Sequence, residues 1–438
     1  MVYFEKIKGK LLQSALFKDS VWSLIGNVLG KGLALIVGIV IARFLGKDIY
    51  GEYGMIKSTL MNIAIFSTFG LGYTATKFIA ESKLNNKEKI REIVSLVITI
   101  TLAVSSLLSL LLFIFSQEVA VYLNAPHLSL SLKIFAVTIV FNALTTVQIG
   151  ILAGFNEFKI IAKNNVIVGV STFLLTIPLT YFWNIEGALF ALLLSYIINC
   201  ILNNVAVRKS LNLYPTKSST SQVSVKSLFS FSLPIALQEA LYSITSWVYI
   251  LLLVKFSDYG EVGIYSVAIQ WSSVILFIPA VLRNVTLSHL SGTNKNQEQH
   301  NRVFRTMMFV TILSTLIPVF LVFLFSGFIS KFYGASFDTL KIVLNISVFT
   351  TIFSCIVNVY SQEYISQNKN WIMFVVRLFR DVGTICLAYV LMTSILDLNY
   401  KATGAYWLVI SSLVMNCITV LFLYLIGKIY LNFSITNA

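Results

Sequence analysis

The chain has 438 residues, of which 57% are hydrophobic and 11% are charged, and its formal net charge at pH 7 is +14. Soluble globular proteins average about 45–50% apolar and about 25% charged residues, so an ordinary soluble protein of this length is excluded. Apolar runs long enough to cross a bilayer recur from residue 21 to residue 427 with short polar breaks. The sequence therefore predicts a polytopic helical membrane protein without a separate soluble catalytic domain, and not an enzyme.

Residues 1–20 form a short basic segment before the first apolar run. This segment is predicted to be an amphipathic helix at the cytoplasmic membrane surface rather than a signal peptide. Twelve spans follow it, so the expected fold class is all-α with twelve transmembrane helices. The predicted spans cover about 21–43, 50–78, 93–115, 130–154, 162–182, 187–207, 228–254, 262–288, 304–327, 341–365, 371–393 and 404–427.

The longest polar connector lies between spans six and seven and divides the chain into two sets of six helices. The predicted parts are an N-terminal lobe (21–209), a cytoplasmic linker (210–227), a C-terminal lobe (228–428) and a tail (429–438). A shift of 212 residues aligns Gly51-Glu52-Tyr53 with Gly263-Ile264-Tyr265. Because each lobe has an even number of spans, the two repeats are predicted to be parallel, as in transporters with a central pathway.

Lysine and arginine are concentrated in alternate loops. The set of loops that includes the N-terminal segment holds twenty of them, and the opposite set holds five. The positive-inside rule therefore predicts that both ends of the chain lie in the cytoplasm. This topology signal accounts for most of the net charge, so a nucleic-acid partner is not expected.

The cysteines and histidines show no spacing typical of a metal site or a disulfide framework. Cys200, Cys355, Cys386 and Cys417 lie inside apolar runs and are interpreted as buried packing residues. A Walker-type phosphate-binding motif is absent from the sequence, which disfavours an ATP-driven pump. We therefore expect neither a bound metal nor a cofactor.

Ionisable side chains inside the spans are the main functional signal. Each charge near the bilayer centre costs about 2.5–3.5 kcal/mol, so most of them are expected to face protein or a water-filled cavity. The cations are Lys31, Lys57, Arg283, Arg377 and Arg380, and the carboxylates are Glu239 and Asp381. A cavity with this cationic balance suits a polyanion such as a pyrophosphate group.

Structural roles for the same residues stay open. Arg377 and Asp381 are spaced i, i+4 and can pair with each other on one helix. Lys57 and Arg283 lie nearer to span ends, where a long side chain can reach the interface. Glu239 and Asp381 are candidates for binding a coupling proton or sodium ion, because intramembrane carboxylates often serve in relays.

Segment 41–53, from Ile41 to Tyr53, resembles the R-x-L-G-x-x-x-Y-G-x-Y motif of bacterial polysaccharide flippases. Residues 70–73 and 262–268 fit the same pattern. These flippases are the O-antigen and capsule-type (Wzx) members of the multidrug/oligosaccharidyl-lipid/polysaccharide exporter superfamily. The resemblance implies a MATE-like fold of two six-helix lobes around a central cavity.

The resemblance to these flippases further implies ion-coupled translocation of an undecaprenyl-pyrophosphate-linked oligosaccharide across the bacterial cytoplasmic membrane by alternating access. The implied partners are the lipid-linked glycan, membrane lipid and other polysaccharide assembly proteins, and the chain is expected to work as a monomer. Two alternatives stay open. A MATE-like cation or drug antiporter would have a mainly acidic cavity, and a membrane-embedded glycan polymerase would carry a large external loop or an acidic DxD-type site.

Overall fold

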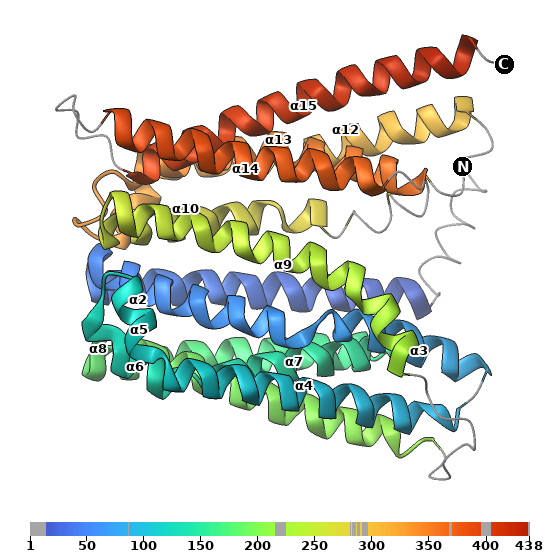
Figure 1. The fold of residues 1–438 in the computed structure, drawn as a ribbon, viewed down its shortest axis with the longest axis horizontal. Coiled ribbons are helices and arrows are strands. Elements are labelled where there is room, and N and C mark those ends of the chain that lie inside the picture. Colours follow the sequence, from blue (N-terminus) through green and yellow to red (C-terminus); the bar gives the residue numbers. More distant parts are fainter. Residues whose placement is uncertain are drawn as a thin grey trace. The chain divides into compact units, whose positions relative to one another are not determined.

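The computed structural model describes residues 15–85, 87–214, 225–280, 297–367, 370–395 and 404–436, together with 282, 286 and 290. Within this part every regular element is a helix and none is a strand, which confirms the all-α fold class (Figure 1). Most of the predicted N-terminal surface helix and of the inter-lobe linker lies outside the described residues.

The first half of the chain forms helices that coincide with the first six predicted spans. They are α2 (Ala15–Thr68), α3 (Leu71–Asn85), α4 (Lys89–Ile114), α5 (Ser116–Tyr122), the short 3-10 helix η1 (Pro126–Leu128), α6 (Ser129–Phe135), α7 (Thr138–Gly154) and α8 (Phe158–Leu211). Spans one and two are joined at Gly46, whose φ of 73° breaks α2 and suits a residue without a Cβ. Spans five and six are joined inside α8 by the non-helical residues Trp183 and Asn184.

In the described part of the second half, each remaining predicted span contains one of six further helices, and span eight also includes a turn at residue 276 followed by helical residues 277–280. These helices are α9 (Val225–Phe256), α10 (Tyr259–Ile275), α12 (Gln297–Tyr333), α13 (Leu340–Ser366), α14 (Asn370–Ile395) and α15 (Gly404–Thr436). Asp258 caps α10, where its Oδ1 accepts a hydrogen bond from the backbone N–H of Glu261 at 2.9 Å. Helix α15 continues through most of the segment that we predicted as a C-terminal tail.

Length and apolar character agree with repeated membrane crossing. Five described helices, α4, α8, α12, α13 and α15, are each long and apolar enough to span a bilayer. The segments Pro126–Phe135 and Thr138–Gly154, bent by 46°, qualify together as a sixth. The protein is therefore a multi-pass membrane protein.

The chain packs as two compact units. Unit 1 consists of Met1–Phe44 and Met55–Trp247, and unit 2 consists of Leu45–Gly54 and Val248–Ala438. The turn between spans one and two thus packs with unit 2, and the first part of α9 packs with unit 1. Polar and aromatic contacts hold that part of α9 in unit 1, since Trp247 Nε1 donates to Thr59 Oγ1 at 3.2 Å and stacks on Tyr122.

One hydrophobic cluster of unit 1 lies between α3, α4, α7 and α8. Ile79, Ile90, Val147 and Ile151 are its fully buried centre. Arg91 borders this cluster and donates hydrogen bonds to the carbonyl oxygens at the end of α8, at 2.9 Å to Leu211 and 3.2 Å to Tyr214. Burial raises the pKa of the Tyr214 hydroxyl, and the nearby charge of Glu157 raises it further.

The glycine motif of the sequence has a packing role in unit 2. A Cβ atom on Gly51 would collide with the carbonyl group of Tyr259, and one on Gly263 would collide with the carbonyl oxygen of Lys47. Gly51 and Gly263 are the two glycines that the 212-residue shift aligns, so equivalent turns of the two repeats meet backbone to backbone. The neighbouring Tyr50 is buried and donates a hydrogen bond to Gln270 Oε1 at 3.5 Å.

Candidate functional site

Arg380 and Asp381 form an ion pair on α14 in unit 2. Arg380 Nε lies 2.8 Å and Nη2 lies 2.7 Å from Asp381 Oδ1. The two side chains are 19% and 6% exposed, respectively, so the pair is largely removed from solvent. Burial disfavours a lone charge strongly, and the contact therefore lets both groups stay ionised inside the helical unit.

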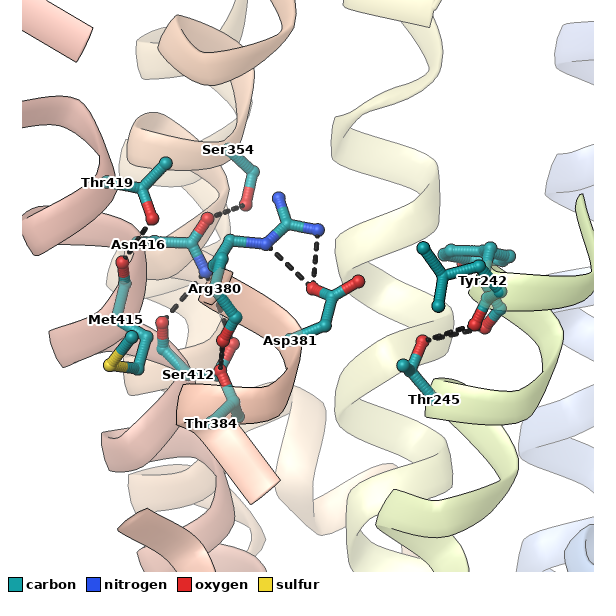
Figure 2. A network of polar contacts seen from close by, with 11 residues as sticks. Tyr242, Thr245, Ser354, Arg380, Asp381, Thr384, Ser412, Met415, Asn416 and Thr419 are labelled. Atoms are coloured by element: carbon teal, nitrogen blue, oxygen red, sulfur yellow. Dashed lines mark hydrogen bonds and ion pairs between the residues drawn. The ribbon is translucent and has the colours of Figure 1, made fainter. Parts of the chain in front are cut away.

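Polar side chains of α13 and α15 lie on the Arg380 side of this ion pair (Figure 2). Ser354 Oγ donates to Asn416 Oδ1 at 3.3 Å, which links α13 to α15. Asn416 Nδ2 donates to the carbonyl oxygen of Ser412 at 2.8 Å, and Thr384 Oγ1 donates to that of Arg380 at 2.8 Å. These hydrogen bonds link α13 to α15 and fix polar side chains on the helices next to α14.

Close packing fixes the position of α14 beside α15. A Cβ on Gly383 would collide with the side chain of Met415, so α15 approaches α14 where glycine leaves room. Gly383 lies only two residues after Asp381. The backbone that carries the ion pair is consequently held by the neighbouring helix, which favours a fixed geometry for both charges.

The remaining predicted cations lie on α14, on α2 or outside the described residues. Arg377 is half-buried on α14, one turn before Asp381, and Lys57 has an exposed side chain on the second half of α2. Lys31 and Glu239 lie within α2 and α9, but their side chains are outside the described part, as is the whole of Arg283. Of the seven predicted residues, the structure shows Arg380 and Asp381 in direct contact. Arg380 and Asp381 are adjacent in the sequence, whereas the i, i+4 spacing on a helix pairs Arg377 with Asp381.

A second ionisable contact in unit 2 is absent from the sequence predictions. His300 on α12 places Nε2 at 2.8 Å from Glu363 Oε1 and 2.9 Å from Oε2 on α13. The His300 residue is 2% exposed. Gln367 Nε2 also donates to Glu363 Oε1, at 2.6 Å. His300 and Glu363 lie 63 positions apart, so only the packing of α12 on α13 reveals the contact.

Glu261 is a third buried ionisable residue of unit 2. It is 4% exposed, and its Oε2 accepts a hydrogen bond at 3.0 Å from the backbone N–H of Ala405, in the first turn of α15. A carboxylate at a helix N-terminus is stabilised by the helix dipole and satisfies a free N–H group. We therefore assign Glu261 a structural role, holding α10 to the start of α15.

Unit 1 has a different polar interior. Asn164 Nδ2 donates to Asn203 Oδ1 at 2.9 Å, and Asn203 Nδ2 donates to Asn199 Oδ1 at 2.9 Å. Gln148 Nε2 contacts the Sγ atom of Cys200 at 3.6 Å. These contacts between neutral groups lie between the spans of α8 and the neighbouring α7, and the Oε1 atom of Gln148 is buried there without a hydrogen-bond partner.

The four cysteines differ in their exposure. Cys200 and Cys355 are buried as predicted, but Cys386 is exposed on α14, so its prediction as a buried packing residue was wrong. The helical period places this apolar position on an outer face of its helix. The described residues include no cluster of three or more His, Cys, Asp or Glu side chains that could hold a metal ion.

The fold of the chain is that of known transporters. It superimposes on the lipid II flippase MurJ in an inward closed conformation with a TM-score of 0.74, 17% sequence identity, and coverage of 93% of this chain and 87% of that chain. It superimposes on an inward-facing multidrug resistance MATE family transporter with a TM-score of 0.72, 14% identity, and coverage of 94% of both chains. These likenesses confirm the expected MATE-like fold class.

Two curated relatives are similar in sequence. An uncharacterized membrane protein, MJ1375, from Methanocaldococcus jannaschii is 26% identical over 241 residues, which are 52% of this chain. The EPS I polysaccharide export inner membrane protein EpsE from Ralstonia nicotianae is 23% identical over 297 residues, which are 66% of this chain. The matches span 56% and 66% of the lengths of these two relatives.

The family model described as "Polysaccharide biosynthesis protein" matches residues 16–287. That match covers more than half of the chain and includes both glycine-containing turns of the repeat. The resemblance that segment 41–53 indicated is thereby confirmed, and the chain belongs to the polysaccharide biosynthesis protein family.

Proposed function

We propose that this protein is a flippase that moves a lipid-linked oligosaccharide, of the undecaprenyl-pyrophosphate type, across the bacterial cytoplasmic membrane by alternating access. The observation that carries this proposal is the family match over residues 16–287. The similarity to a polysaccharide export protein and the fold shared with a lipid II flippase support it. Both termini are assigned to the cytoplasm by the distribution of lysine and arginine.

The cations inside the spans are proposed to bind the diphosphate of the substrate. The set is Lys31, Lys57, Arg283, Arg377 and Arg380. Arg380 shares its charge with Asp381 in a close ion pair, which lowers the attraction that a diphosphate gains from Arg380. Arg377 and Lys57 are the other described cations of this set, and we expect both to contribute to substrate affinity.

Coupling to a proton or a sodium ion is proposed to use Asp381, with Glu239 as a second candidate. A diphosphate that attracts Arg380 would weaken its contact with Asp381 and leave a carboxylate in a largely buried place. Burial makes such a carboxylate a favourable site for a proton or a cation. Binding of substrate and of the coupling ion would then be linked through one ion pair.

The test is glycan export in a bacterial strain that lacks its own flippase and carries this protein. Arg377→Ala and Lys57→Ala should each reduce the surface glycan strongly, with lipid-linked glycan accumulating inside the cell. Lys331→Ala, which removes an exposed cation at the end of α12, is the matched control and should export normally. Immunoblots of the membrane fraction establish that all variants insert equally. Normal export by every single alanine variant of the five cations, and by their combination, would refute the proposed binding site.

The shared fold with a MATE transporter makes a cation or drug antiporter the second candidate. Expression in a drug-sensitive strain separates the two, because an antiporter would confer resistance to cationic dyes and a flippase would not. A membrane-embedded polymerase is separated by a third result. Purified protein given a lipid-linked donor would then form new glycosidic bonds, whereas a flippase changes only the leaflet in which the donor resides.

A further inference from the structure

We propose that His300 and Glu363 form a proton-binding site, which takes up one proton from the side of the membrane that the charge pattern assigns to the cytoplasm. The site joins the first turn of α12 to the last turn of α13 in unit 2. It is separate from the residues proposed for substrate binding and for coupling, and it does not depend on the identity of the glycan.

The geometry of the pair suits a shared proton. The His300 Nε2 atom lies almost equally far from both carboxylate oxygens of Glu363, at 2.8 and 2.9 Å. The side chains are 3% and 17% exposed, so His300 is shielded while an edge of Glu363 stays accessible. A proton can therefore reach the carboxylate edge and be held between a buried imidazole and a carboxylate.

The other buried ionisable contacts of unit 2 suit proton uptake less well. Arg380 keeps its proton under all physiological conditions, so its contact with Asp381 is a permanent ion pair while the two groups touch. Glu261 accepts a backbone N–H at the start of α15, an arrangement that favours its anionic form. In the His300–Glu363 pair, both the imidazole and the carboxylate are groups that can bind or release a proton.

The surroundings of Glu363 favour a state without net charge. A hydrophobic cluster lies at the end of α13 that carries Glu363, and it also includes residues of α14 and α15. Its members are Val357, Tyr364, Met373, Val376 and Leu423. An unbalanced charge next to such a cluster is disfavoured, whereas an imidazolium–carboxylate pair is neutral overall. Taking up one proton converts the neutral imidazole beside an anionic carboxylate into this balanced pair.

Other titratable groups near the pair are few in the described part. Tyr360 on α13 lies within electrostatic range of Glu363 and of Tyr424 on α15. On α12 the nearest charged residues, Glu298, Arg302 and Arg305, have exposed side chains. The first turns of α14, residues 371–376, contain no ionisable residue. The charges around the pair in the described part are therefore those of the pair itself and of these exposed side chains of α12.

Protonation has a structural consequence for the two helices. Protonation adds the attraction between an imidazolium cation and a carboxylate anion to the hydrogen bond, so the protonated pair ties α12 to α13 more firmly. In unit 1 the position equivalent to Glu363 under the 212-residue shift is Ile151, which is fully buried. The contact therefore belongs to one repeat only, and proton uptake would tighten a helix pair in unit 2 without an equivalent change at that position of unit 1.

The test is nuclear magnetic resonance of the full chain in lipid nanodiscs with isotope-labelled histidine. The protein has three histidines, so comparison with His300→Gln assigns the signal of His300 directly. Between about pH 5 and about pH 9 we expect the His300 signal to change from the imidazolium to the neutral form. Glu363→Gln, which keeps a hydrogen-bond acceptor but removes the charge, should move the midpoint of this change to lower pH. The matched control is Glu298→Gln, which should leave the midpoint in place.

A second measurement counts protons and uses no labelled residue. After a jump from about pH 8 to about pH 6, a pH-indicator dye should show that wild-type protein takes up about one proton more than His300→Gln. A His300 signal that stays neutral over the whole range, or a midpoint that Glu363→Gln does not move, would show a purely structural hydrogen bond and overturn the proposal. Neither measurement involves a glycan, so failure of the flippase function would leave these results unaffected.

Discussion

Units 1 and 2 have similar helical architecture but different polar interiors. In the described part, the buried carboxyl and imidazole side chains are Glu261, His300 and Asp381, and all three belong to unit 2. In unit 1, amides such as Gln148, Asn164 and Asn203 are the larger buried polar groups. Neutral contacts between membrane helices contribute about 0.6 kcal/mol on average, whereas a buried charge without its partner is much less favourable. Among the described residues, the buried groups that can respond to charge thus lie in unit 2, whereas the larger buried polar groups of unit 1 are neutral.

Among the variants that test this contrast between the two units, removal of one member of the Arg380–Asp381 pair should lower the free energy of unfolding most. We expect Asp381→Ala to lower the free energy of unfolding by about 3 kcal/mol, because Arg380 is left largely buried without its partner. Unfolding of the purified protein by a denaturing detergent measures this change. The double variant Arg380→Met with Asp381→Ala should recover most of the stability, since it contains no lone charge. Equal stability of the single variant and the wild type would show that solvent already screens the pair.

An intermediate effect is expected in the neutral interior of unit 1. Asn203→Leu removes the acceptor of Asn164 and the donor to Asn199, so we expect a loss of about 1 kcal/mol in the same unfolding measurement. Replacing Asn164 by leucine as well should cause little further loss, because this removes the buried amide that had lost its acceptor. If Asn203→Leu lowered the free energy of unfolding as much as Asp381→Ala, the contrast between the neutral interior of unit 1 and the charged interior of unit 2 would be wrong.

The sequence predicted the fold class and the family because these depend on local composition and on short motifs, and the repeat stays a prediction. Gly51 and Gly263 were aligned by the repeat, but their backbone contact in unit 2 follows from the approach of α10 to the turn after Gly46. The contact between His300 and Glu363 requires knowledge of which face of α12 meets α13. Adjacent residues on a helix seldom face each other, so the pairing of Arg380 with Asp381 depends on side-chain rotamers that a sequence does not encode directly.

The polar linker after residue 209 marks where one predicted lobe ends, but contacts divide the chain differently. Unit 2 includes Leu45–Gly54, because the Gly51 turn packs on α10, and unit 1 extends to Trp247, because α9 packs on the second half of α2. Hydropathy marks the ends of spans and does not report which helices touch. The lobe boundaries at 209 and 228 therefore stay a prediction.

The smallest effect on stability is expected at Glu261, whose carboxylate accepts a hydrogen bond from the backbone at the N-terminus of α15. Glu261→Gln keeps a carbonyl oxygen for the N–H of Ala405 and loses the attraction between a carboxylate and the N-terminus of α15. This attraction is worth about 0.3–1 kcal/mol, so hydrogen exchange in the first turn of α15 should accelerate by at most about fivefold. Glu298→Gln, at an exposed position of α12, should leave that exchange unchanged. An acceleration of a hundredfold or more would mean that Glu261 carries a charge balance like that of Asp381, and the structural role assigned to it would then have to be abandoned.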